Sequence, residues 1–316
     1  MKRRRRKHTV GQAQAAPVRN LTKASPQRMT GGWHIEDVTP YDAQHQSPIE
    51  KKALWLLALC HDVLEIRSQP SRVSYLDSSG KDRHHIPDFV VGLREGPLYV
   101  EVKALANLVR PDSLDKFLAV AKAYLRQNKR FAFLVDAQLE EEPLFEAISI
   151  LRRYVNCDPT PNKAHLILNA LNEGPLPKKE LLKIPGVELV DIFVMLARKQ
   201  ISWDSEQSVL NDNLLLSLPG KPFEGIRLAN ILRTTRYGHL LEDLALGRRP
   251  SDKSGLAHAA AWRQSYQPVN PYQFFGGFVS ASAIRDIGVS ESSARKAWDR
   301  RDQAPGAAIV EAQQGK

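Results

Sequence analysis

The chain of 316 residues is 42% hydrophobic and 25% charged, which is the composition of a soluble globular protein with about two domains. No apolar run approaches the roughly 18 residues of a membrane-spanning helix, so an integral membrane protein is excluded. The basic N-terminus continues into Gln, Ala, Pro and Ser without the apolar segment of a secretory signal, and two cysteines are too few for a disulfide framework or a CxxC zinc site. We therefore expect a cytoplasmic protein without membrane contact.

The net charge of +10 is concentrated at the two ends. Residues 1–31 hold nine Lys or Arg and no acidic residue, and residues 220–316 hold fourteen basic against nine acidic residues. We predict that residues 1–40 are a flexible arm, because so polar a segment buries too little apolar surface to fold by itself. Such an arm suits sequence-independent contacts with DNA phosphates, although a solvated tail or a nuclear import signal is an alternative. Its opening cluster consists of Lys2, Arg3, Arg4, Arg5, Arg6 and Lys7.

The first folded domain is predicted over residues 41–157, and its fold class is α/β. Ser47 followed by Pro48 is typical of a helix start, and the wide apolar face up to about Asp62 indicates a helix that packs on a sheet. Short turns join the next three strands, so we predict a β-meander. The three strands of this meander are expected at 71–76, 83–91 and 98–103. A helix at 114–125, a strand at 131–135 and a helix at 142–154 follow them.

A second, mostly helical domain is predicted over residues 160–219. Three short helices within 164–199 are followed by two short strands near 201–203 and 214–218. This order is that of a winged helix, a fold that also serves protein contacts, and any small helical adaptor domain is the alternative.

The sequence pattern of the last third of the chain predicts fewer helices and strands. We predict that residues 220–316 are a C-terminal extension whose tail after Gln303 is disordered. Residues 280–301 have the pattern of a helix-turn-helix, with an ordinary pair of surface helices as the alternative.

Two short motifs on the predicted hairpin carry the chemistry. Asp88 follows Pro87 on one strand, and Glu101, Val102 and Lys103 end the next strand. Side chains alternate along a strand, so Glu101 and Lys103 share a face and Asp88 can lie beside Glu101. Two adjacent carboxylates with the Val102 carbonyl form a hard-oxygen site suited to Mg²⁺, for which Mn²⁺ can substitute.

Such a site suits hydrolysis of a phosphodiester. A divalent ion neutralises the two carboxylates, polarises the phosphodiester and generates hydroxide near neutral pH. Lys103 can orient or deprotonate the attacking water and stabilise the charge that develops on phosphorus. Glu50, at the start of the preceding helix, would supply a third carboxylate. A surface hairpin that carries Glu and Lys without a function is the alternative, but it does not require a Pro-Asp pair on the opposite strand.

These residues resemble the N-terminal catalytic domain of TnsA-type transposon endonucleases, a PD-(D/E)xK family with a restriction-endonuclease-like mixed sheet flanked by helices. The similarity covers about residues 45–136 and rests on the segments 69–75, 84–89 and 99–103. By this resemblance the active site consists of Glu50, Asp88 and Lys103 with Mg²⁺, and Glu101 and the Val102 carbonyl complete the metal shell.

The resemblance also implies a role and partners. The enzyme would cut the non-transferred strand at the 5′ ends of a transposon during cut-and-paste transposition. A DDE transposase subunit would cut the 3′ ends, and an AAA+ ATPase would regulate both. The protein would be bacterial and associated with DNA, and a winged-helix domain would follow the nuclease domain. Residues 220–316 exceed this two-domain pattern.

Two further residues and two other functions stay open. His84 and His85 point to opposite faces of a strand, so at most one of them, with His85 as the candidate, could touch phosphate or metal. Gln69 could bond to DNA or to the catalytic strand, or cap a turn. The alternative functions are a stand-alone restriction-type or repair nuclease of the same fold, and a DNA-binding regulator whose nuclease-like domain is inert.

Overall fold

The computed structural model describes residues 30–234, 237–251 and 255–265. The basic cluster at residues 2–7 and the predicted helix-turn-helix at 280–301 lie outside the described residues. The chain divides into two compact units, Met1–Trp262 and Arg263–Lys316, and the predicted domain boundary near residues 157–160 falls within the first. None of the described helices has the length and apolar character that crossing a bilayer requires.

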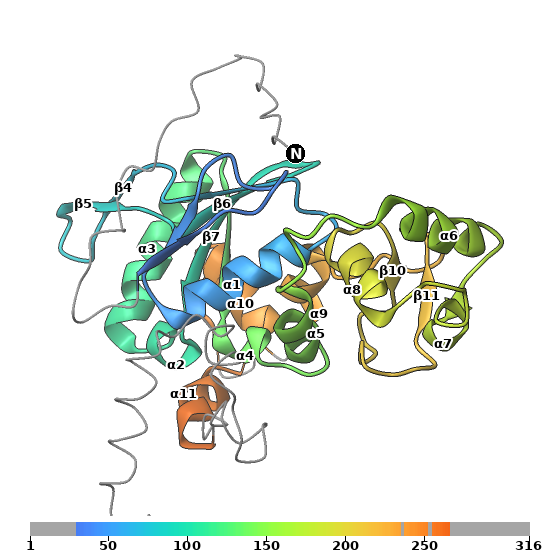
Figure 1. Cartoon of the computed structure of the whole chain (residues 1–316). Coiled ribbons are helices and arrows are strands. Elements are labelled where there is room, and N and C mark those ends of the chain that lie inside the picture. Colours follow the sequence, from blue (N-terminus) through green and yellow to red (C-terminus); the bar gives the residue numbers. More distant parts are fainter. Residues whose placement is uncertain (1–29, 235–236, 252–254, 266–316) are drawn as a thin grey trace, which may run out of the picture. The chain divides into compact units, whose positions relative to one another are not determined.

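A four-stranded mixed sheet is the centre of the first unit (Figure 1). Its strands, in spatial order, are β3 (Glu65–Ser68), β6 (Phe89–Leu93), β7 (Gly96–Lys103) and β8 (Arg130–Val135). β7 runs antiparallel to β6 and parallel to β8. A parallel pair needs a crossover connection, and helix α3 (Pro111–Arg126) supplies it.

Helices cover both faces of this sheet, as alternation along the strands requires. On one face Val100 and Val102 pack in the same core as helix α1 (Pro48–Leu59). On the other face Phe131 and Phe133 pack with α3. The side chains that precede and follow Val102 on β7 therefore lie on the α3 face, at the end of the strand.

The predicted β-meander is wrong in its strand pairing. The strand expected at 83–91 is two strands, β5 (Asp82–His85) and β6, because Pro87 between them has no N–H to donate to a ladder. β5 pairs with β4 (Val73–Leu76) in a separate hairpin, which is held against α3 by the buried Val73 and Tyr75. β3 takes the place beside β6 that the meander gave to residues 71–76.

Shorter elements complete this α/β part of the chain. The predicted helix at 142–154 is a single helix of eight residues, preceded by one short helix and followed by turns. The elements are β1 (Gly31–Trp33), β2 (Ala43–His45), α2 (Leu105–Leu108), α4 (Asp136–Leu139) and α5 (Leu144–Leu151).

Residues 160–219 form three helices and a small three-stranded sheet of order β10-β11-β9. The buried Lys178 donates hydrogen bonds from Nζ to the carbonyls of Val209 and Leu210, at 3.0 and 2.8 Å, and so anchors the long loop before the last strand. The elements are α6 (Pro161–Asn172), β9 (Leu176–Pro177), α7 (Lys178–Leu181), α8 (Leu189–Ala197), β10 (Ser202–Trp203) and β11 (Leu215–Ser217).

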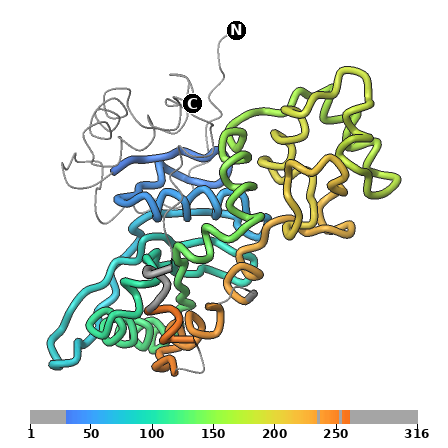
Figure 2. The backbone as a smooth tube through the Cα atoms, turned by 90° about the horizontal axis from the view of Figure 1, so that it is seen from below, coloured from blue at the N-terminus to red at the C-terminus, as the bar shows by residue number. Residues whose placement is uncertain are grey.

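The chain then returns to the central sheet, which the sequence did not predict. Helices α9 (Leu228–Thr234) and α10 (Gly238–Ala245) contact β8, and α10 also contacts α3. In Figure 2 this orange segment lies against the teal and green part of the chain. Asp62, just after α1, caps α9 by accepting hydrogen bonds from the backbone N–H groups of its first two residues, at 2.8 and 3.1 Å. One further helix is α11 (Leu256–Ser265).

Candidate active site

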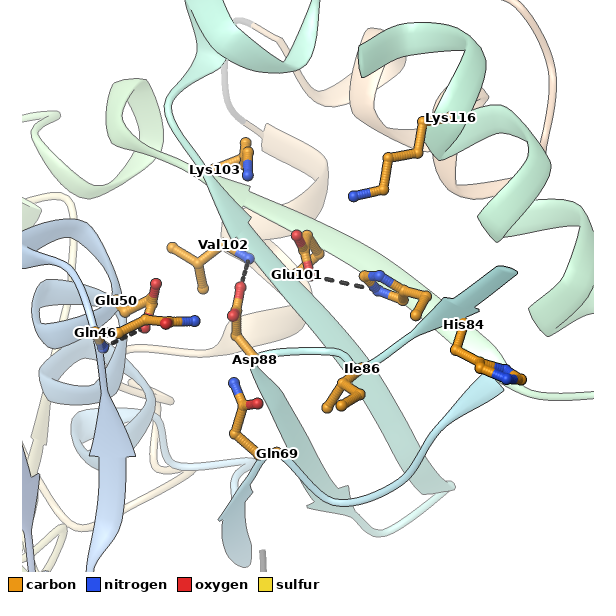
Figure 3. A pocket seen from close by; sticks show the side chains of 11 residues that line it. Gln46, Glu50, Gln69, His84, Ile86, Asp88, Glu101, Val102, Lys103 and Lys116 are labelled. Carbon is orange, nitrogen blue, oxygen red and sulfur yellow. Dashed lines mark hydrogen bonds and ion pairs between the residues drawn. The ribbon is translucent and has the colours of Figure 1, made fainter. Parts of the chain in front are cut away.

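The predicted site residues meet at one pocket, beside the end of β7 (Figure 3). The pocket is a cavity of about 280 Å³ that is open to solvent on one side. The seven predicted residues that line it are Glu50, Gln69, His85, Asp88, Glu101, Val102 and Lys103.

Strand register brings Asp88 and Glu101 together. Phe89 on β6 is paired with Val100 on β7, so the preceding Asp88 lies across from Glu101. The Val102 N–H donates a hydrogen bond of 2.8 Å to Asp88 Oδ2, which fixes the carboxylate at the end of the strand pair. Both side chains are buried, with residue exposures of 8% for Asp88 and 6% for Glu101. Two carboxylates are therefore held side by side out of water.

Burial and mutual repulsion make these carboxylates unusually basic. Burial raises the pKa of Asp88 to about 7, and the nearby Glu50 carboxylate adds to this rise. Burial raises the pKa of Glu101 well above its usual range, with Asp88 as the second cause. Both groups prefer the proton unless a cation replaces it.

Glu50 is held by the start of helix α1. Ser47 is the N-cap residue of α1: its Oγ accepts from the Glu50 N–H at 3.2 Å and donates to Glu50 Oε1 at 2.8 Å. Glu50 Oε2 accepts from the Gln46 N–H at 2.6 Å. The carboxylate thus reaches the pocket from the α1 side while it caps the helix.

Lys103 lines the pocket from the end of β7, on the α3 face of the strand. Its Nζ is 5.8 Å from the centroid of the Phe117 ring. It forms no ion pair with a described residue beyond its electrostatic interaction with Asp88 and Glu101, so its ammonium group remains available to a ligand.

The two histidines diverge, as alternation on β5 predicts. His85 is buried among the rings of Phe117, Tyr124 and Phe131, and its Nε2 lies 3.4 Å from Glu101 Oε2. Burial, with the charges of Lys116 and Lys103, lowers the pKa of His85 to about 3, so the imidazole is neutral. His84 is exposed and its Nδ1 lies 3.0 Å from Ser74 Oγ.

Gln69 lines the pocket with a left-handed backbone, at φ +50°. Its N–H donates a hydrogen bond of 3.0 Å to the Asp88 carbonyl. Non-glycine residues adopt this conformation only at a cost, so the tight junction between β3 and the Asp88 segment is held by the surrounding structure.

Four pocket residues, Gln46, His84, Ile86 and Lys116, were not among the predicted site residues. Gln46 immediately precedes the Ser47 cap, and this position by the predicted helix start was the only signal for it. Lys116 lies on α3, thirteen positions after Lys103, and only the docking of that helix brings its side chain to the pocket (Figure 3).

The donor set fits Mg²⁺ or Mn²⁺. Glu101 Oε2 is buried and has no hydrogen-bond partner in the part of the chain that the structure describes, as expected of an oxygen kept for a cation. No group of three His, Cys, Asp or Glu among the described residues could hold a metal ion by itself. This arrangement suits Mg²⁺, which is usually held by one or two carboxylates and keeps several waters.

The fold and the site together define a class. A mixed sheet with helices on both faces, carrying an acid pair and a lysine at one end, fits the restriction-endonuclease-like fold. Residues 60–135 match the family described as TnsA-like endonuclease N terminal. This part of the chain is therefore similar to the N-terminal domain of TnsA-like endonucleases. Asp88, Glu101 and Lys103 lie inside the matched segment, and Glu50 lies before it. No curated protein matches the chain.

Proposed function

We propose that the chain is the Mg²⁺-dependent endonuclease subunit of a heteromeric transposase. It hydrolyses the non-transferred strand at the 5′ ends of a transposon during cut-and-paste transposition, in the bacterial cytoplasm. Its partners are a DDE transposase subunit, which cuts the 3′ ends, and an AAA+ ATPase regulator. The observation that carries the proposal is the meeting of Asp88, Glu101 and Lys103 in one open pocket inside a TnsA-like endonuclease domain.

Each residue has a proposed task in the hydrolysis. Asp88, Glu101 and the Val102 carbonyl would hold the ion, and Glu50 would add a carboxylate from the first turn of α1. When bound, Mg²⁺ or Mn²⁺ polarises the phosphodiester and favours ionisation of a water molecule. Lys103 orients that water or stabilises the charge that develops on phosphorus, because it lines the same pocket and lies close enough to Asp88 and Glu101 to interact with both.

Two parts of the chain supply the wider contacts. The cluster Lys2 to Lys7 binds DNA phosphates without reading sequence. The proposal includes a winged helix at residues 160–219, which the order α6-β9-α7-α8-β10-β11 and the β10-β11-β9 sheet support.

The winged-helix segment suits a protein partner better than a DNA groove. It holds six Lys or Arg against seven Asp or Glu. Its third helix, α8, carries no basic residue and is buried apart from Leu189 and Val190. A helix that reads a major groove presents polar and basic side chains to the bases. This observation supports docking of a transposase subunit.

Lys103→Ala tests the proposed function. The variant should still bind divalent metal and join its partner on transposon-end DNA, but cutting should slow by about 10²–10³, the usual effect of losing one transition-state contact. Because the partner still cuts and joins 3′ ends, products should change from simple insertions to cointegrates. The measurements are calorimetric titration with Mn²⁺ and sequencing of insertion products.

The outcomes separate the alternatives. Lys122→Ala, at an exposed lysine on α3, is the control and should leave the products unchanged. Continued simple insertion by the Lys103 variant would mean that another protein cuts the 5′ strand. If the wild-type chain cuts DNA without any transposase, a stand-alone nuclease is favoured. If the wild-type chain does not cut even with the transposase present, an inert regulator is favoured.

A further inference from the structure

A second lysine reaches the candidate active site from helix α3. Lys116 lines the same cavity as Asp88 and Glu101, and its side chain points into it from the side opposite Glu50 (Figure 3). The neighbouring Leu114 and Phe117 are buried in the core between α3 and the sheet, so the backbone that carries Lys116 is firmly placed.

Lys103 and Lys116 share one aromatic support. Their Nζ atoms lie 5.8 and 5.0 Å from the centroid of the Phe117 ring. Phe117 is 1% exposed and packs edge to face on Phe133, with 5.5 Å between ring centroids. The ring attracts both cations and so holds two ammonium groups near the same side of the pocket.

Neither ammonium group is neutralised by a carboxylate outside the site. Among the described residues, Lys116 forms no ion pair, although its charge acts on Glu101 and His85. Two cations that repel each other beside an open cavity are stabilised when an anion with two acceptor oxygens lies between them. A phosphodiester is such an anion, and it gains negative charge on its non-bridging oxygens as a water attacks.

We propose that Lys116 is a second catalytic lysine, whose Nζ donates a hydrogen bond to a non-bridging oxygen of the scissile phosphate while Lys103 faces the attacking water. The inference rests on the proposed nuclease function. In the step itself a water oxygen forms a new bond to phosphorus and the bond from phosphorus to the leaving deoxyribose oxygen breaks. The water loses one proton and the leaving oxygen gains one. Lys116 forms no covalent bond and exchanges no proton, so its effect is purely electrostatic.

The test uses the full chain with its transposase subunit and a duplex that carries the transposon end. The scissile phosphate is first mapped with the wild type. Lys116→Gln should then lower the single-turnover rate with Mg²⁺ by about 10²–10³. Lys116→Arg, which keeps the charge, should recover most of the rate. Lys122→Gln, an exposed lysine on the same helix, is the matched control and should leave the rate unchanged within about twofold, the small effect usual for an exposed site.

Phosphorothioate substitution identifies the atom that Lys116 contacts. In the wild type, sulfur in one of the two non-bridging positions of the scissile phosphate should slow cutting, and this effect should disappear in Lys116→Gln. Binding of the end duplex with Ca²⁺, measured by anisotropy, should be the same for the variant and the wild type. Together these results would support the inference.

Three results would overturn it. The first is a wild-type rate in Lys116→Gln. The second is an unchanged effect of sulfur substitution in that variant. The third is a decrease in rate that weaker DNA binding explains entirely, which would mean that Lys116 contacts a flanking phosphate. Failure of the wild type to cut at all would instead overturn the proposed function, so the two failures are distinguishable.

Discussion

At the scale of single residues, Asp88 and Glu101 lie where burial disfavours the charged form of each carboxylate. Both carboxylates are buried beside each other, and burial and mutual repulsion raise the pKa of each. A chain selected for stability alone would avoid this pair, because hydrophobic or amide side chains of similar size are cheaper to bury. A bound cation would stabilise the charged forms of both carboxylates, which is what a metal-dependent enzyme requires.

The raised pKa of Asp88 predicts how stability depends on pH without metal. The folded chain binds this proton with a pKa of about 7, whereas an unfolded Asp has a pKa of about 3.9. Between these values the folded state holds more protons, so stability is highest at low pH and falls as the pH rises through this window. Each pKa unit corresponds to about 1.4 kcal/mol, or about 2–4 °C in Tm for a chain of this size.

Asp88→Asn should remove much of this dependence, because an amide is neutral and can still accept from the Val102 N–H. In EDTA, the Tm of the wild type should fall between about pH 5 and 8 by more than that of the variant. Mg²⁺ should raise the wild-type Tm at the upper end of this range and leave the variant nearly unchanged. Thermal melts across this range provide the check. If the Tm of the two proteins changes with pH in the same way, the pKa of Asp88 is not raised in the folded state. Nicking should be lost in the variant.

Among the predicted site residues, Asp88, Glu101 and Lys103 are those that local geometry determines. Alternation along one strand places Glu101 and Lys103 on a common face, and hairpin register places Asp88 across from Glu101, so spacing alone was sufficient. Lys116 depends on how α3 docks on the sheet, and no local pattern encodes that docking. It therefore became visible only in the structure.

At the scale of elements, Pro87 changes the fold more than the alternating pattern indicated. It ends β5 and turns the chain before β6, so that the hairpin of β4 and β5 leaves the main sheet and carries His85 to the site. Periodicity predicted strand residues at both ends of 83–91 but missed the break at residues 86–88, and it cannot say with which strand a segment pairs. Strand pairing is a tertiary property, which explains why the helices and β7 were predicted better than the meander.

Helix α10 offers a test of the unpredicted return to the sheet. Leu244 is fully buried against the core of α3 and β8, whereas Leu246 just after the helix is 40% exposed. Leu244→Ala should cost about 2–5 kcal/mol of unfolding free energy, because it leaves a cavity in a packed core. Leu246→Ala should cost below about 1 kcal/mol. Urea unfolding of both variants decides the matter, and equal losses would argue against docking of α10 on the nuclease sheet.

At the scale of the whole molecule, charge and catalysis are predicted to lie in different parts of the chain. Deleting residues 1–31 removes nine Lys or Arg and should weaken binding to non-specific duplex DNA. The slope of log K against log salt should become shallower by up to about 0.9 for each lost phosphate contact. A chain whose first 31 residues are shuffled keeps the charge and should keep the slope. A deletion variant with the wild-type slope would show that the arm does not touch DNA.

The return of α9 and α10 to β8 also has a consequence for synthesis on the ribosome. β8 ends at Val135, and α10, which covers part of its outer face, ends only at Ala245. Those roughly 110 residues take about 6–22 s to translate at about 5–20 residues per second. During this delay the face of β8 that α10 covers is exposed to water, and the nascent nuclease domain lacks part of its core. The core around the candidate active site is thus complete only after residues well beyond the Asp88 and Glu101 motifs have been made.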